Sequence, residues 1–139
     1  MFNWFWKRER KALEFADSGS AFAHACAVGY TPLIGALIPA LVLEEGERGR
    51  DGERTFLIRL AGDKSESEFW TCTLKETLGQ PKPGDFVGFR VFMIADDMPE
   101  PINLIGFIAC RLERVFVEGK GWVVAQNYTP KNIKQAIRL

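Results

Sequence analysis

His24 is the residue with the widest range of catalytic uses, and it is the single histidine of the chain. A serine or cysteine nucleophile activated by an imidazole would have to use it. A zinc site built around it would lack the second histidine or close cysteine pair of the common sites. Because His24 lies in an alanine-rich segment with helical spacing, we interpret it as a histidine on a helix surface or between helices. The sequence therefore predicts no catalytic residues and no metal ligands.

The cysteines and acidic clusters give no stronger indication of a catalytic or metal-binding site than His24 does. Cys26, Cys72 and Cys110 are odd in number and form no close pair, which indicates neither a disulfide framework nor a zinc site. They are expected to be small buried residues, although Cys72 and Cys110 could be neighbours across a sheet. The acidic loop over 96–100 does not have the spacing of an EF-hand. No cofactor is predicted. An enzyme would need Arg59, Asp85, Arg90 and Glu113 to converge in one pocket.

The bulk composition is that of one globular domain. The chain has 139 residues, 47% of them apolar, with 18 basic and 18 acidic side chains. This length fits a single core, and the balanced charge leaves no overall field that would attract nucleic acid or anionic lipid. The sequence shows no secretory signal, and glycines and prolines interrupt the apolar run over 21–43. A cytoplasmic location is expected.

The elements that would position these residues change character at residue 38. Residues 1–30 are predicted to be a helical N-terminal segment, either one bent helix or two short ones, with Ser18 or Ser20 as a cap. Gly29 is expected to end it. The region 38–127 alternates with a period of two, which predicts strands. Thr129 and Pro130 have the form of a cap and a first helical residue, so 129–139 is predicted to be a short C-terminal helix.

Five or six strands are expected in the alternating region. The predicted strands are 38–45, 54–61, 68–75, 86–94, 102–117 and 122–126. Their number and spacing predict a mainly β, antiparallel barrel with helical additions, because closure removes the exposed edges of a small sheet. In strand count and spacing this pattern resembles an OB-like or SH3-like small barrel. No diagnostic motif carries that resemblance, so it implies no active residues.

Both faces of the predicted sheet are apolar. Val87, Phe89 and Val91 share one face, which we assign to the core. The opposite face mixes aromatic and arginine side chains and forms the candidate binding face, whose residues are Arg59, Phe69, Phe86, Arg90, Phe92 and Phe107. The protein's own N-terminal helix, a second subunit or a ligand could cover it. Stacking of bases or sugars on these rings is one such possibility.

The N-terminus combines aromatic and basic residues. Phe2, Trp4, Phe5 and Trp6 precede Lys7 and Arg8, a composition found in short interfacial membrane anchors. A helix docked on the barrel or exchanged between subunits explains it equally well. We expect a non-catalytic binding or scaffolding module that engages a protein partner or itself. Binding of single-stranded nucleic acid or polysaccharide and peripheral membrane association are the alternatives.

Overall fold

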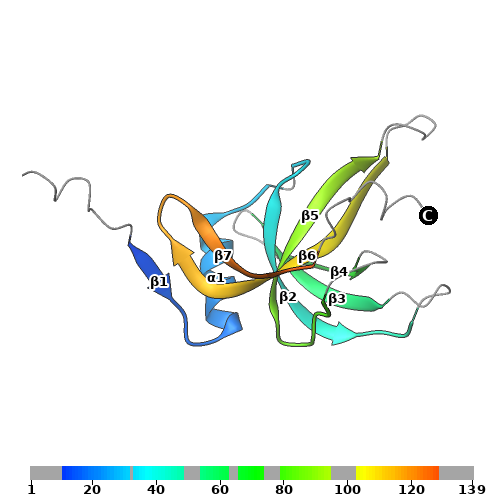
Figure 1. Ribbon diagram of the computed structural model, residues 1–139, viewed down its shortest axis with the longest axis horizontal. Helices are drawn as coiled ribbons and strands as arrows, with labels where there is room; N and C mark the ends of the chain where they lie inside the picture. The colour runs from blue at the N-terminus through cyan, green and yellow to red at the C-terminus, as the bar shows by residue number, and fades with distance from the viewer. Residues whose placement is uncertain are drawn as a thin grey trace, which may run out of the picture.

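The fold is a mainly β arrangement with one helix, and the computed structural model describes residues 11–31, 33–48, 54–62, 66–73, 79–94 and 103–128. The elements in chain order are β1 (Ala12–Glu14), α1 (Ser18–Val28), β2 (Leu37–Glu45), β3 (Thr55–Ala61), β4 (Glu66–Cys72), β5 (Phe86–Ile94), β6 (Asn103–Val117) and β7 (Gly121–Asn127). Figure 1 shows them along the chain. The predicted N-terminal residues 1–10 and the predicted C-terminal helix over 129–139 lie outside the described residues.

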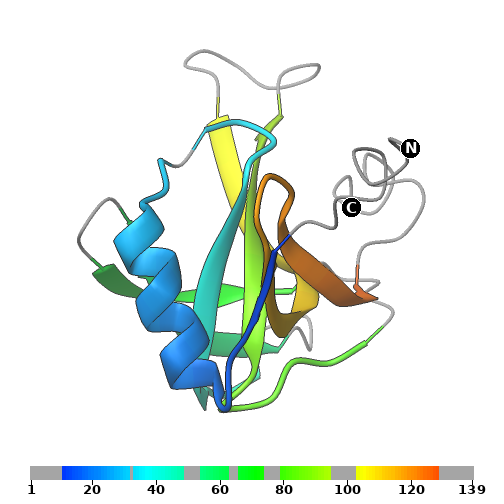
Figure 2. The same cartoon turned by 90° about the vertical axis from the view of Figure 1, so that its left-hand side faces the viewer.

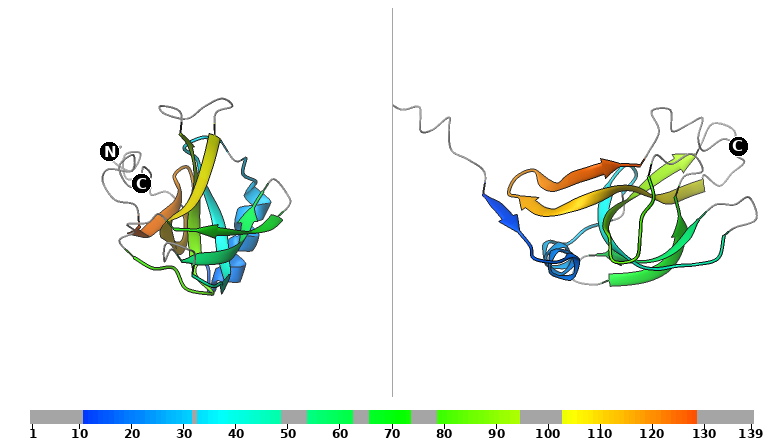
Figure 3. Two further views of the ribbon diagram at one scale, coloured as in Figure 1. Left: turned by 90° about the vertical axis from the view of Figure 1, so that its right-hand side faces the viewer. Right: turned by 60° about the horizontal axis from the view of Figure 1, so that its bottom comes forward.

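The strands form one antiparallel sheet with seven members. Their order is β1-β6-β5-β2-β3-β4, and β7 pairs with β6. The predicted closure into a barrel is corrected, because the described strands form an open sheet in which β4 meets β6 only through a parallel bridge between Thr73 and Ile108. The two strands meet only just beyond the end of β4, so no continuous ladder joins them within the described ranges. Figure 3 shows β3 and β4 running across the direction of β5 and β6.

The N-terminal region differs from the predicted helix. Ala12–Glu14 pairs with Val115–Val117 as an antiparallel strand, and the N–H of Phe15 donates to the carbonyl of Arg114 at 2.9 Å. Helical spacing was overridden here because the end of β6 supplies backbone partners from far along the chain. The helix α1 begins only at Ser18, and its cap is Asp17, whose carboxylate accepts from the N–H of Ser20 at 2.7 Å. That hydrogen bond lowers the pKa of Asp17.

Gly29 ends α1, as predicted. Its φ of 87° lies in the left-handed region that favours glycine, and its N–H donates to the carbonyl of Ala25 at 3.0 Å. The chain then turns into β2. Figure 2 shows α1 standing beside β2 on one side of the sheet.

Each face of the sheet has its own buried cluster. The inner cluster consists of Ala40, Val42, Phe56, Ile58, Val87, Phe89, Ile108 and Tyr128. The outer cluster joins Ala21, Phe22 and Ala25 of α1 to Ala61, Phe86, Cys110 and Leu112 of the strands. The helix therefore covers part of the second apolar face. This accounts for apolar residues on both sides of β5, because neither side faces water.

A β-bulge changes the faces of β6. Gly88 pairs with Cys110 and Phe89 pairs with Ile108, which leaves Ala109 as an extra residue. Strict alternation would place Ile108 and Cys110 on the same face. In the structure Ile108 belongs to the inner cluster and Cys110 to the outer one.

Candidate functional site

An exposed tryptophan stands on the outer surface of the β3–β4 hairpin. Trp70 lies directly opposite Leu57 in the register of these strands, and 54% of it is exposed. Its neighbour Phe69 points the other way and packs edge-on against Phe89 of the inner cluster, with ring centroids 5.5 Å apart. Because successive strand residues alternate between faces, Trp70 faces away from the core. Large apolar side chains in such positions mark interaction sites when polar groups surround them.

The indole ring of Trp70 packs against the backbone at Gly46. A Cβ at this position would lie 2.6 Å from Cζ3 of Trp70 and 2.9 Å from Oγ1 of Thr55. The glycine therefore allows the ring to lie against the backbone at the end of β2. The N–H of Gly46 donates to the carbonyl of Thr55 at 2.9 Å, and the Thr55 hydroxyl donates to the carbonyl of Glu47 at 2.8 Å. These bonds hold the support of the ring in place.

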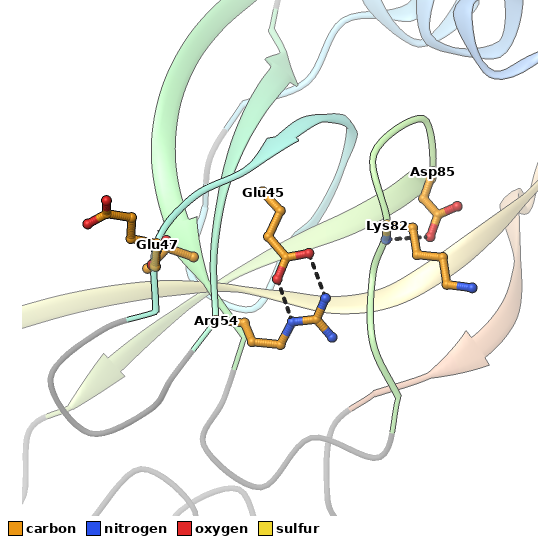
Figure 4. Close-up of polar contacts among 6 residues, drawn as sticks. Glu45, Glu47, Arg54, Lys82 and Asp85 are labelled. Carbon is orange, nitrogen blue, oxygen red and sulfur yellow. Dashed lines mark hydrogen bonds and ion pairs between the residues drawn. The ribbon is translucent and has the colours of Figure 1, made fainter.

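Ion pairs lie on both faces of the sheet formed by β2, β3 and β4. Arg54 donates through Nε and Nη2 to the two carboxylate oxygens of Glu45, at 2.8 and 2.7 Å (Figure 4). This hydrogen bonding lowers the pKa of Glu45 and raises the pKa of Arg54. Arg59 lies 2.8 Å from Glu68 and 3.7 Å from Glu66. Glu45 lies opposite Phe56, and the guanidinium carbon of Arg54 lies 5.4 Å from the centroid of the Phe56 ring, so this pair belongs to the inner face. Arg59 and its carboxylates share the face of Trp70.

The charge of this surface is negative. On the face of Trp70 the register places the acidic side chains of Glu44, Glu66 and Glu68 and the basic side chain of Arg59. Glu66 and Glu68 alternate with inward-facing residues, so they lie on the same face of β4 as Trp70. We refer to Leu57, Arg59, Glu66, Glu68 and Trp70, together with Gly46 below the indole, as the Trp70 surface.

Four members of the candidate binding face predicted from the sequence share one face of the sheet. Arg59 and Phe86 both lie opposite Leu41, and Arg90 lies opposite Leu37 and Phe107. Phe86 and Phe107 are buried, at 2% and 1% exposure, and Phe69 packs against the inner cluster. Arg90 donates through Nη1 to the carbonyl of Gly35 at 2.8 Å. Arg59 alone belongs to the Trp70 surface. The side chain of Phe92 lies outside the described part of the chain, as do Phe2, Trp4, Phe5, Trp6, Lys7 and Arg8.

The sequence analysis assigned Phe69 to the mixed outer face, whereas the structure places it inside. The faces of β4 were reversed because alternation does not say which of its two rows faces the core. One feature of the sequence could have identified the solvent-facing row of β4. Glu66 and Glu68 share a row with Trp70, and two ionised carboxylates are costly to bury without partners, so that row has to be the solvent face.

His24 takes part in an aromatic cluster between α1 and the β6–β7 hairpin. Its ring lies 5.1 Å from that of Phe15, 5.0 Å from Phe116 and 5.9 Å from Trp122. Its Nε2 is buried and has no hydrogen-bond partner among the described residues. Trp122 donates through Nε1 to the Tyr30 hydroxyl at 2.9 Å. The cluster packs α1 onto the sheet, and no described nucleophile or carboxylate is hydrogen-bonded to the imidazole.

A pocket of about 470 Å³ opens where β1, α1, β5 and β6 meet. Asp85 and Glu113, two of the residues considered for catalysis, line it, whereas Arg59 and Arg90 do not. Asp85 accepts a hydrogen bond from the N–H of Lys82 at 2.9 Å (Figure 4), and Arg114 at the pocket wall donates to the carbonyl of Ala16 at 2.9 Å. These contacts tie the polar lining to the protein's own backbone.

The remaining site predictions concern metals, disulfides and membranes. Within the described ranges, no group of acidic, histidine and cysteine side chains could hold a metal ion. No disulfide joins Cys26, Cys72 and Cys110, all of which the structure describes. Burial raises the pKa of the Cys110 and Cys26 thiols. The one described helix, with 11 residues, is too short to cross a bilayer.

A second exposed apolar group lies at the connection between α1 and β2. Val28, Leu33 and Ile34 are 50%, 63% and 57% exposed.

Comparison with known proteins adds no family to these observations, since no protein-family model, no curated protein and no solved structure matches the chain.

Proposed function

We propose that the protein is a non-catalytic binding module that engages a protein partner through the Trp70 surface. The observation that carries this proposal is the 54% exposure of Trp70. An exposed tryptophan lowers the solubility of a protein unless a binding partner covers it. Tryptophan is also enriched among the residues that dominate binding energy at protein interfaces. A rigid aromatic centre within a polar rim is the usual anatomy of such interfaces.

The strand pairing supports an OB-like assignment of the same surface. β2 pairs with both β3 and β5, and the bridge between Thr73 and Ile108 brings the end of β4 to β6. In OB-folds the second and third strands present the ligand-binding face. Counted from β2, those strands are β3 and β4. The position of Trp70 therefore agrees with where this architecture binds its ligands.

The charges favour a protein over a nucleic acid. Binding to single strands depends on basic groups that neutralise phosphates. Here Arg59 is engaged by Glu68, and Glu44 and Glu66 lie on the same face. A polyanion would have to displace these carboxylates. The membrane alternative rests mainly on residues 2–8, which lie outside the described part, and the apolar group at Leu33 and Ile34 has no aromatic anchor.

Selection from a peptide display library on the full-length protein tests the proposal. Selected peptides should lose about 2 kcal/mol of binding free energy, about 30-fold in Kd, when Trp70→Ala is introduced. Val124→Ala is the matched control, because Val124 is 47% exposed and lies on β7. Peptides that bind Trp70→Ala as tightly as the wild type, or a failure to select any peptide, would refute the proposal.

A further inference from the structure

β4, the strand that carries Trp70, is an edge strand of the sheet. β4 pairs with β3 over seven consecutive positions, from Thr55 opposite Cys72 to Ala61 opposite Glu66, without a bulge. The strand order ends there. An edge strand presents backbone N–H and C=O groups that can pair with another chain.

The backbone hydrogen bonds of β2 show which residues of β4 point to the edge. The N–H of Val42 donates to Asp85 at 3.0 Å, and its carbonyl accepts from Gly84 at 2.7 Å, so the backbone groups of Val42 point away from β3. Its cross-strand neighbour Ile58 must then point toward β4. The bond from Gly46 to the carbonyl of Thr55 agrees, because Thr55 has the opposite parity.

Alternation along the ladder completes the assignment. Phe56, Ile58 and Leu60 exchange hydrogen bonds with Thr71, Phe69 and Ser67. The intervening residues of β4, Glu66, Glu68 and Trp70, therefore direct their N–H and C=O groups to the outer edge. Within the described ranges no backbone hydrogen bond outside the β3–β4 ladder involves these three residues. The residues with available backbone groups are the same three whose side chains form the Trp70 surface.

We propose that the partner of this surface is an extended, basic peptide segment that pairs with β4 as an additional strand. The proposal rests on the proposed function and names the class of partner. Side chains opposite one another in neighbouring strands interact directly, and opposite charges there are favourable. Glu66 and Glu68 are 53% and 44% exposed at their side chains, so lysine or arginine opposite them would gain ion pairs. An apolar residue would lie against Trp70.

A second copy of this chain is a poorer occupant. Antiparallel pairing of two β4 strands about Glu68 would set Glu68 against Glu68, and a shifted register would set Glu66 against Glu68. Like charges directly opposite are destabilising. Glu66 against Glu66 also repels, and Glu68 against Trp70 gains no ion pair. Trp70 against Trp70 would have to extend to Cys72, beside the bridge from Thr73 to Ile108. The two glutamates thus oppose self-association while they favour a basic strand.

Amide hydrogen exchange in the full-length protein tests the free edge first. The amides of Glu66, Glu68 and Trp70 should exchange at least 10-fold faster than those of Ser67, Phe69 and Thr71. Equal protection of all six would mean that the edge is already covered, and would overturn the proposal.

Two eight-residue peptides then serve as probes, with valine on one face and either lysine or glutamate on the other. The lysine peptide should slow exchange at Glu66, Glu68 and Trp70 about 10-fold, and the glutamate peptide should not. The double variant Glu66→Lys/Glu68→Lys should reverse this preference. N-methylation of alternate amides of the lysine peptide should abolish binding, because it removes the donors that pair with the edge.

The outcomes separate the two proposals. A lysine peptide that shifts the Trp70 indole resonance without protecting the three amides would refute strand addition and leave the Trp70 surface as a binding site. Absence of binding by the lysine peptide would overturn strand addition as well. A homodimer formed through β4 and detected by light scattering would replace the basic segment with a second copy. Only the failure of the Trp70→Ala test would remove the proposed function itself.

Discussion

Replacing Gly46 by alanine tests the packing of the Trp70 ring against the backbone at Gly46. The added Cβ would lie 2.6 Å from Cζ3 and 3.2 Å from Cη2 of Trp70. Carbon atoms in contact lie about 3.5–4.0 Å apart, so the ring edge has to move by about 1 Å. The other close atom, Oγ1 of Thr55 at 2.9 Å, is held by its hydrogen bond to Glu47. Because Trp70 is half exposed, the indole is the group that yields.

The magnitude follows from two opposing terms. Overpacking costs about 1–3 kcal/mol, and the low end applies where a neighbour can move into solvent. Alanine also restricts the unfolded chain, which gains about 0.4–1 kcal/mol where the backbone angles permit it. Gly46 does not have a left-handed φ, so no backbone strain is added. We expect a net destabilisation of at most about 0.6 kcal/mol. Peptide affinity should fall about 10-fold, since about 1.4 kcal/mol of the anchor's contribution is lost with its position.

Urea unfolding and the indole N–H resonance of Trp70 measure the two effects. Gly19→Ala is the matched control, because a Cβ there meets its nearest atom, Oδ1 of Asp17, at 3.4 Å and adds a good helix former to α1. That control should leave the indole resonance and peptide binding unchanged. A Gly46→Ala protein with an unshifted indole resonance and wild-type peptide affinity would refute the packing of Trp70 on Gly46.

Two further predictions concern α1. Phe86→Ala should lower the free energy of unfolding by about 3–5 kcal/mol, because Phe86 is buried beneath α1 and packs edge-on against Trp122 at 4.8 Å; a loss below 1 kcal/mol in urea unfolding would contradict that burial. Asp17→Ala should lower the thermal midpoint at neutral pH. The folded-state pKa of Asp17 is depressed below 3.8, so its contribution is present above that value and is lost as pH falls through the lower folded pKa. A midpoint difference that does not shrink as pH falls below 3.8 would contradict its role as a charged cap.

Local alternation determined much of the sheet. The strand Phe86–Ile94 was predicted with the bounds that the structure has, and its row of Val87, Phe89 and Val91 does face the core. Gly29 as the helix end was also readable, because a positive φ is a local requirement. These features depend on neighbouring residues only, and period-two patterns record them directly.

Tertiary structure decided what depends on distant partners. Ala12–Glu14 became a strand because Val115–Val117 offered it a backbone ladder, and the bulge at Ala109 moved Cys110 to the outer face. The candidate binding face is not an open surface for the same reason: Phe86 and Phe107 are buried, and its arginines contact the carbonyl of Gly35 and the carboxylate of Glu68. Trp70 is the exposed aromatic side chain instead, because the register of β4 against β3 sets which row of β4 faces the solvent. The sequence by itself determined that this chain is a mainly β domain with two apolar sheet faces. Only the pairing of strands, which joins residues by backbone bonds across the chain, decided which aromatic side chain is left in water.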